Sequence, residues 1–526
     1  MKSVLLNLFA IISLLASTAC NPTKNVGHVI GGSDDEQQEQ GNQQGGGNQQ
    51  GGDNQQGSGE NQGGNGGQSE QPEPTPPDPV PTPGKTFYVS PDGSDNNPGT
   101  QEAPFKTLKM GIGSAGPGTT VYLCDGTWSE KVTMTVSGTE EAPIVIAAAP
   151  GQTPVIDGGN GEGWSQETTV DGKNLMLDFA TVDAKLPKVY PDDGLIVIRG
   201  ASYIEIRGIT VQSSPSSGIF CSKGASHLNI NHCRLINCVA PGVCFGAEYS
   251  PSTDIKVTDN YVKNCAQRSR EAISLRTVTG FEVARTVVEK VVKECIDAKS
   301  GCANGSIHHN EVIDGGHVSI YADAGYGNTP EEKNIDIYNN IIRNPYGVAI
   351  CVAAESGNSC SNIRIYNNLA YNAVGKSRGA GIKVAKNDSN TSGVIKDVFI
   401  YNNTVGGFNQ QGIYVNYPNI DNIVIQNNIV VSTMDNIAIS TANGVPAAEV
   451  LVFNNLSSGN KCSFPGTDLI SADPQFNNAA AADYTLKASS PAVDAAKGDY
   501  IASTDLADTT RPQGAGADLG AYERAK

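Results

Sequence analysis

The feature that most constrains this chain is a short apolar, β-prone run that closes on an asparagine and keeps returning. The copies that end on asparagine do so at Asn260, Asn310, Asn340, Asn368, Asn403, Asn428 and Asn455. Cys233 and Thr286 fill the same slot in two further copies, and successive copies lie 24 to 35 residues apart. A drifting repeat of that length indicates a solenoid, because each unit can bury its apolar face only against the next unit.

The repeated asparagine suits a turn between two strands. Asparagine tolerates left-handed backbone angles, and its side-chain amide is able to bond to the equivalent amide one coil away. We therefore predict an all-β fold, a single-stranded right-handed parallel β-helix with a cap at each end. Such a fold offers a long, rigid, outward-facing strip.

The N-terminal segment predicts the location of the protein. In residues 1–20, Lys2 precedes an apolar stretch that is too short to remain as a membrane span and leads into Ser17-Thr-Ala-Cys20. These residues resemble the lipobox of bacterial lipoproteins, and the alternative is an ordinary signal peptide cut before an incidental cysteine. Lipidation of Cys20 would anchor the chain to a membrane, and we expect the cell-surface side of a bacterial outer membrane.

The rest of the chain divides by composition. Residues 21–85 are rich in Gly, Gln and Asn and then in Pro, and they cannot bury enough apolar surface to fold, so we predict a disordered tether. The body then comprises an N-terminal cap over 86–136, the β-helix over 137–460 and a C-terminal capping segment over 461–526. The N-terminal cap, which begins Phe87-Tyr-Val-Ser-Pro-Asp-Gly, resembles the start of exported β-helix proteins that act on carbohydrates, and the C-terminal segment, with Ala517-Asp-Leu-Gly-Ala-Tyr-Glu523, resembles the one common on surface β-helix proteins.

Net charge limits the classes of binding partner, and the cysteine count bears on disulfide bonding. The formal net charge of −18 argues against nucleic acid, and an acidic glycan would need a metal or a local basic cluster to bind. The chain has 12 cysteines, eleven besides Cys20, and most are expected to be buried thiols. Cys238 and Cys265 should stack one coil apart, and a loop closed by Cys351 and Cys360 is the alternative. We expect a monomer.

Period-two alternation places side chains on the outward strip. With one isoleucine of each coil inside, the outward positions predicted are Ser274, Asp297, Tyr321, Cys351, Lys383 and Tyr414. The next outward positions are Arg276, Lys299 and Asp323. Alternation alone would turn Glu271 and Glu294 inward, so a strand edge or bulge must turn them out, because an unpaired buried charge is costly.

This cluster suits two chemistries. Acids such as Glu271, Glu294 and Asp297 offer oxygen ligands for Ca²⁺, which could hold a uronate carboxylate. A lysine beside that metal and Arg276 could act as a general base that abstracts the C5 proton of a uronate and starts β-elimination. The non-catalytic alternative is a solvated set of cross-strand ion pairs.

At these residues the chain resembles the alginate lyase and chondroitinase B family of β-helix polysaccharide lyases. The stretch Glu294-Cys-Ile-Asp-Ala-Lys299-Ser300, followed by Asn304, matches the family pattern of a calcium-binding Glu and a Lys base. The resemblance implies that Glu294 is a calcium ligand and Lys299 the base. Val292 stands where the family has a further Glu, and Arg276 is the only nearby substitute for its arginine.

Other polar residues extend the candidate site. His317 is a candidate acid or base, Tyr321 a candidate proton donor to the leaving oxygen, and Asp323, Lys383 and Tyr414 candidates for binding the glycan. We predict a surface-anchored polysaccharide lyase that cleaves an acidic, uronate-containing glycan by β-elimination. The alternatives are a non-catalytic glycan-binding or adhesive protein and a glycoside hydrolase.

Overall fold

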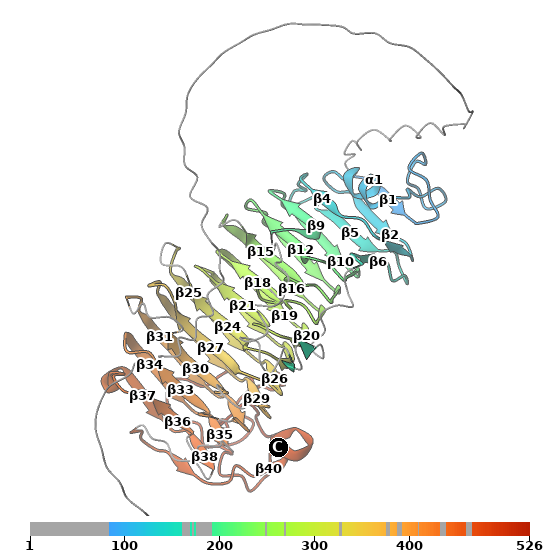
Figure 1. Cartoon of the computed structure of the whole chain (residues 1–526). Coiled ribbons are helices and arrows are strands. Elements are labelled where there is room, and N and C mark those ends of the chain that lie inside the picture. The colour runs from blue at the N-terminus through green and yellow to red at the C-terminus, as the bar shows by residue number, and fades with distance from the viewer. Residues whose placement is uncertain are drawn as a thin grey trace, which may run out of the picture.

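The computed structural model describes residues 84–525, except 160–168, 171–172, 175–191, 248–249, 268–269, 326–328, 375–378, 387–391, 409, 432–437 and 459–464. The predicted signal segment, nearly all of the tether and Cys20 lie outside this range. Within it, three long parallel sheets run the length of the molecule, which confirms the predicted all-β parallel solenoid (Figure 1). No helix in the described part is long and apolar enough to cross a membrane.

Each coil contributes one strand to each of the three sheets. The first sheet has 13 strands, in the order β1 (Thr86–Val89), β2 (Thr120–Leu123), β5 (Ile144–Ala148), β10 (Ile204–Arg207), β13 (Leu228–Asn231), β16 (Ser252–Thr258), β19 (Val278–Ala284), β22 (Ala303–His308), β25 (Glu332–Tyr338), β28 (Cys360–Tyr366), β31 (Ile395–Tyr401), β34 (Ile420–Gln426) and β37 (Val450–Phe453). The second sheet also has 13, in the order β3 (Thr127–Trp128), β6 (Val155–Asp157), β11 (Thr210–Gln212), β14 (Arg234–Ile236), β17 (Tyr261–Lys263), β20 (Val287–Val291), β23 (Glu311–Gly315), β26 (Ile341–Arg343), β29 (Leu369–Tyr371), β32 (Thr404–Gly406), β35 (Ile429–Val431), β38 (Leu456–Ser458) and β39 (Ile470–Ser471).

The third sheet carries the predicted site. It has 11 strands, in the order β4 (Val132–Met134), β9 (Gly194–Arg199), β12 (Ser217–Ser222), β15 (Val243–Ala247), β18 (Ile273–Arg276), β21 (Ile296–Lys299), β24 (Val318–Ala324), β27 (Val348–Ala354), β30 (Ile382–Lys386), β33 (Ile413–Asn416) and β36 (Ile439–Thr441). Two short antiparallel pairs lie outside the solenoid: β7 (Thr169–Val170) with β8 (Lys173–Asn174), and β40 (Phe476–Asn478) with β41 (Asp483–Leu486). The 3₁₀ turns are η2 (Ala447–Glu449) and η3 (Ala479–Ala481).

A short helix covers the N-terminal end. Helix α1 (Leu108–Gly113) begins after Thr107, whose side-chain oxygen accepts a hydrogen bond from the backbone N–H of Met110 and so caps the first turn. Leu108 and Ile112 are buried in the same core cluster as Val89 of β1. The helix therefore closes an end at which the coils would otherwise expose apolar side chains.

The repeated asparagines form a buried ladder between the first and second sheets. The Nδ2 atom of Asn368 donates to Oδ1 of Asn403 at 3.0 Å and to the backbone oxygen of Ile337 at 2.9 Å, and its own Oδ1 accepts from Asn340. The predicted amide-to-amide bonding is thus confirmed. The left-handed backbone angle falls one residue earlier, on residues such as Asn367 with φ of 53°, because the ladder asparagine itself must point inward.

The C-terminal segment returns along the outside of the solenoid. Leu486 and Leu519 pack on Ile429 and Leu456, which face outward from the second sheet. Side-chain amides at the turns hold its backbone: Asn454 donates to the oxygen of Ala495, Asn427 to Tyr500, Asn402 to Asp518, Asn367 to Thr504 and Asn339 to Asp505. The third sheet is not part of these contacts.

Candidate functional site

The register of the third sheet brings the predicted residues together. Ser274 pairs with Asp297, and Asp297 pairs with Tyr321, while Arg276, Lys299 and Asp323 occupy one line across β18, β21 and β24. The three strands are adjacent, so neighbouring side chains on each line are about 4.8 Å apart at the backbone.

A break in the alternation turns Glu271 and Glu294 outward. Ala272 and Ile273 are consecutive, yet both belong to the buried core, and the same holds for Cys295 and Ile296 one coil later. Because two successive residues point inward at this corner, the residue before them points out. The edge or bulge that the sequence required is therefore present.

Lys299 forms a buried ion pair with Glu271. Its Nζ lies 2.6 Å from Oε1 of Glu271, and the two side chains are only 5% and 4% exposed. The hydroxyl of Ser274 donates to the other carboxylate oxygen of Glu271 at 2.6 Å. The alternative prediction, a solvated set of cross-strand ion pairs, does not describe this pair, because both charges are buried away from water.

Asp297 and Asp323 lack such partners. Each has an Oδ1 atom that is buried and accepts no hydrogen bond in the described structure. Burial, and then the charge of Glu271, raise the pKa of Asp297 well above its usual range, although Lys299 acts in the opposite sense. Burial and the charge of Glu355 do the same to the pKa of Asp323. Both carboxyls are therefore set up to hold a proton.

His317 and Glu294 form a dyad at the accessible edge of the cluster. Nδ1 of His317 lies 2.6 Å from Oε1 of Glu294, and the side chains are 36% and 15% exposed. Burial acts to raise the pKa of Glu294, but the hydrogen bond and charge of His317 outweigh it, so that pKa is lowered. Glu294 is thus a carboxylate that orients the imidazole and leaves Nε2 directed elsewhere.

Tyr321 is engaged by a residue that the sequence analysis missed. Its hydroxyl donates to Oε1 of Glu355 at 2.7 Å, and its ring packs with Cys351 and Val348 in an apolar cluster on the outward face. Burial and the charge of Glu355 raise the pKa of Tyr321 well above its usual range, so the phenol keeps its proton. Lys383 and Tyr414 pair with each other two coils further along and are partly exposed.

The strip faces outward, but the side chains of the cluster are buried, so the alternative of solvated ion pairs does not describe it. Ser274, Arg276, Asp297, Lys299, Tyr321 and Asp323 are each less than a tenth exposed. Alternation predicts the face on which a side chain lies, whereas its exposure depends on what else packs there. At His317 the edge of the cluster reaches solvent, with 36% of that side chain exposed.

Two of the three residues predicted to bind calcium already have other partners in this arrangement. Glu271 already binds Lys299 and Ser274, and Glu294 already binds His317. No group of three or more His, Cys, Asp or Glu side chains in the described ranges is placed to hold a metal ion.

The ten cysteines that the structure describes are all free thiols, as expected, and nine are buried. Cys351 lies on the outward face and Cys360 in the core, so the alternative loop-closing disulfide is not formed.

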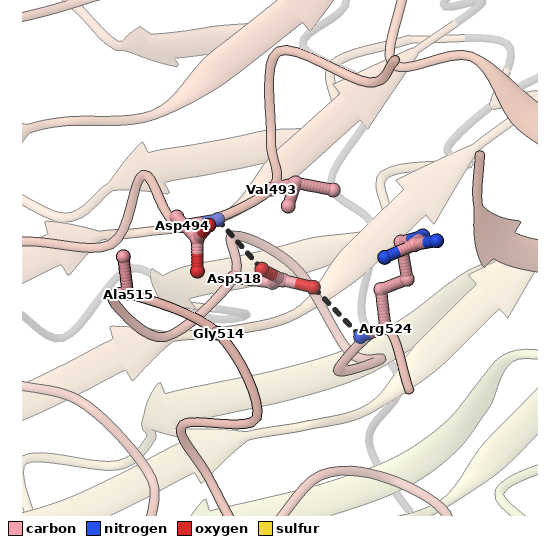
Figure 2. A pocket seen from close by; sticks show the side chains of 6 residues that line it. All are labelled: Val493, Asp494, Gly514, Ala515, Asp518 and Arg524. Atoms are coloured by element: carbon pink, nitrogen blue, oxygen red, sulfur yellow. Dashed lines mark hydrogen bonds between the residues drawn. The ribbon is translucent and has the colours of Figure 1, made fainter. Parts of the chain in front are cut away.

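The structure also shows a cavity elsewhere. A space of about 450 Å³ in the C-terminal segment is lined by Asp494, Asp518 and Arg524, among others (Figure 2). The carboxylate of Asp518 accepts from the backbone N–H groups of Asp494 and Arg524, both at 2.7 Å. These acids hold the fold of the segment, so we take the third-sheet cluster as the candidate site.

Comparison with known proteins agrees with the fold. Residues 87–281 match the family model described as "Pel9A-like, right handed beta helix region". A stretch of 131 residues, 24% of this chain and 28% of the relative, is 33% identical to pectate lyase PEL9 of Emericella nidulans. The chain thus contains a right-handed parallel β-helix of the kind that this family model describes.

Two further similarities extend over more of this β-helix protein. It is 27% identical over 466 residues to the uncharacterized protein YwoF of Bacillus subtilis, spanning 78% of this chain and 92% of the relative. The structure of a GH136 lacto-N-biosidase from Eubacterium ramulus matches 71% of this chain and 68% of that one with a TM-score of 0.50 at 14% identity. The latter similarity concerns the fold alone.

Proposed function

We propose that this protein cleaves an acidic, uronate-containing polysaccharide by β-elimination at the cluster on the third sheet. The observation that carries the proposal is the juxtaposition, on adjacent coils, of the Glu294–His317 dyad and the buried Lys299–Glu271 pair. The similarity to a pectate lyase over part of the chain supports the same class of reaction.

Each residue has a role in the proposed reaction. A base takes the C5 proton of the uronate, its electron pair forms the C4–C5 double bond, the C4–O bond breaks, and the leaving oxygen takes a proton. Nε2 of His317 is the accessible base, oriented by Glu294. The carboxylate of Glu271 favours the ammonium form of Lys299, so Lys299 supplies positive charge to the developing enolate rather than accepting the proton.

The proton for the leaving oxygen comes from Tyr321, whose hydroxyl is kept protonated in its buried position. Arg276, on the same line as Lys299 and Asp323, adds positive charge beside the carboxylate of the sugar. Lys383 and Tyr414 extend the binding strip by two coils.

The test is a product with an ultraviolet-absorbing double bond, released from polygalacturonate, alginate or a glycosaminoglycan. We expect His317→Ala to lower kcat by about 10²- to 10⁴-fold, the range for removal of an acid–base group, and Lys299→Arg, which keeps the positive charge, to lower it less. His227→Ala is the matched control, since His227 forms a similar pair with Asp254, at 3.0 Å, on another face. If the control lowers kcat as much as His317→Ala does, the assignment of His317 is wrong.

A glycoside hydrolase is the second candidate. Asp297 and Asp323 are two carboxyls with raised pKa values on neighbouring strands, the kind of group that serves as a general acid in sugar hydrolysis. New reducing ends without the ultraviolet absorbance would favour this reaction. Binding without any product would favour the non-catalytic glycan-binding protein.

We also propose that Cys20 carries a lipid that tethers the β-helix to the surface of the bacterial outer membrane. The composition of residues 21–85 supports a long, flexible reach toward an external polymer. Cys20→Ser should release the protein from the membrane fraction, and retention of that variant on the membrane would contradict the anchor.

A further inference from the structure

A buried arginine lies beside the cluster and takes no part in the roles assigned above. Arg270 directly precedes Glu271, has a left-handed backbone angle of 61° and a side chain that is 4% exposed. Its Nη1 donates to Sγ of Cys244 at 3.4 Å, and Cys244 pairs with Ser274. The guanidinium therefore lies on the outward face, one coil before the Lys299–Glu271 pair.

The carboxylate that Arg270 binds is an unusual one. Nη2 of Arg270 lies 2.7 Å from Oδ1 of Asp192, a residue 78 positions earlier whose side chain is 57% exposed. Burial acts to lower the pKa of Arg270, but the nearby Cys244, Asp192 and Glu271 raise it, so the guanidinium is always charged. A buried, permanent cation thus has among its partners an acid that remains largely in water.

Arg270 and Asp192 differ in their exposure to water, and therefore in how strongly each contributes to the ion pair. A guanidinium offers a planar fork that suits a carboxylate, and it is less strongly hydrated than an ammonium. An ion pair with a solvent-exposed acid contributes little, because water competes for that acid. A second carboxylate that arrives at Arg270 therefore displaces Asp192 at small expense.

We propose that Arg270 binds the carboxylate of a uronate unit of the glycan, and that Asp192 occupies this position until the glycan replaces it. The inference rests on the proposed function, whose site it extends by one coil. The sugar must be negatively charged, because a neutral glycan has no carboxylate that could replace Asp192 at the guanidinium. The bound uronate lies next to the unit whose C5 proton faces His317.

The proposal is tested by binding of short oligomers of galacturonate, mannuronate and guluronate, measured by calorimetry on the purified protein. Asp192→Asn removes the competitor and should lower Kd by about two- to fivefold, as expected for an exposed pair. Arg270→Gln removes a buried cation and should raise Kd by about tenfold or more. Arg270→Lys should fall between the wild type and Arg270→Gln.

Two controls separate this effect from a general loss of structure. Arg285 forms a bidentate pair with Asp259 at 2.8 and 3.0 Å, at a turn between the first and second sheets, so Arg285→Gln should leave Kd unchanged. A methyl-esterified galacturonate oligomer lacks the carboxylate, so the wild type and Arg270→Gln should bind it equally.

Failure of the two proposals is distinguishable. Binding without an unsaturated product overturns the lyase and leaves the Arg270 measurement valid. If the wild type binds and Arg270→Gln binds as tightly, or if Asp192→Asn binds more weakly, the role of Arg270 is overturned. If neither the wild type nor Asp192→Asn binds any of the three oligomers, both proposals fall.

Discussion

At the scale of single residues, the buried acids of this protein differ in what balances their charge. Glu271 has a lysine and a serine, Glu294 a histidine, and Asp297 and Asp323 each keep an oxygen without a partner. Glu271 and Glu294 fix the positions of Lys299 and His317. Asp297 and Asp323, whose pKa values are raised, retain protons instead.

Glu332 is the extreme case. It begins β25, is fully buried, pairs with Cys360, and neither carboxylate oxygen accepts a hydrogen bond in the described structure. Burial and the charge of Asp323 raise the pKa of Glu332 well above its usual range. A raised pKa stabilises the fold below the unfolded-state pKa of about 4.5, and that stability is lost as pH rises through the folded-state pKa.

We therefore predict that Glu332→Met stabilises the protein at pH 7 by about 1–4 kcal/mol, because folding at that pH forces the Glu332 carboxyl to take up a proton, and replacing buried ion pairs with apolar side chains of similar volume gives gains of this size. The gain should shrink toward pH 4, where the wild-type carboxyl is protonated in both states. Urea unfolding at the two pH values measures it. Glu331→Met, at a partly exposed neighbour, should change the unfolding free energy by less than about 0.5 kcal/mol. A variant that is less stable than the wild type at both pH values would contradict the assignment.

The Lys299–Glu271 pair gives a second prediction. Lys299→Met leaves the carboxylate of Glu271 buried without its main partner, so it should destabilise the fold by about 3–5 kcal/mol. Adding Glu271→Gln should restore most of that loss, because the uncompensated charge is gone. Thermal or urea unfolding of the two single variants and the double variant measures the coupling. Losses that simply add would mean that the two side chains do not interact.

At the scale of the strand and turn, the asparagine ladder links one coil to the next. Asn368 takes part in bonds to two neighbouring asparagines and to the backbone oxygen of Ile337. Asn368→Ala leaves buried backbone and amide groups without partners, so we predict a loss of about 2–5 kcal/mol in unfolding free energy. Asn362→Ala, at an exposed turn amide that donates to Asn334, is the control and should lose less than about 1 kcal/mol. Equal losses would show that burial of the ladder contributes nothing.

Much of the element-scale arrangement follows from the sequence because it depends on local alternation. Ile273, Ile296 and Ile320 set the register, and the register alone places Arg276, Lys299 and Asp323 on one line. Alternation alone gives the wrong direction for Glu294, because two successive inward residues interrupt it there, and only the cost of an unpaired buried charge indicates that Glu294 points outward. Lys299 and Glu271 lie 28 positions apart, and Arg270 and Asp192 lie 78 apart. Such partners depend on side-chain reach, which no repeat pattern encodes.

At the scale of the whole molecule, the second and third sheets of the solenoid differ in what lies on their outward faces. The second sheet exposes apolar residues such as Leu369 and Leu456, and the C-terminal segment covers them. The third sheet carries the charged cluster on its outward side. This division explains why the C-terminal coils have apolar residues at successive positions of the second sheet, one facing the core and one facing the covering segment.

The covering segment should detach before the solenoid unfolds. Leu519 is fully buried against Ile429 and Leu456, so Leu519→Ala should destabilise the attachment by about 2–5 kcal/mol. Hydrogen exchange should then speed up in the residues after 471, while exchange in β16 to β28 stays unchanged. Leu451→Ala, at a side chain that is 52% exposed, should leave both regions as in the wild type. Faster exchange throughout the solenoid would mean that the segment and the coils form one cooperative unit.

We infer that an acidic glycan binds over the outward face of β18, β21 and β24. A crystal structure of the Lys299→Arg variant, which retains the positive charge, soaked with a galacturonate or alginate oligomer tests it most directly. We expect sugar density on this face, with one carboxylate at Arg270 and one sugar ring facing His317. Sugar density confined to the first sheet or to the C-terminal segment would contradict it.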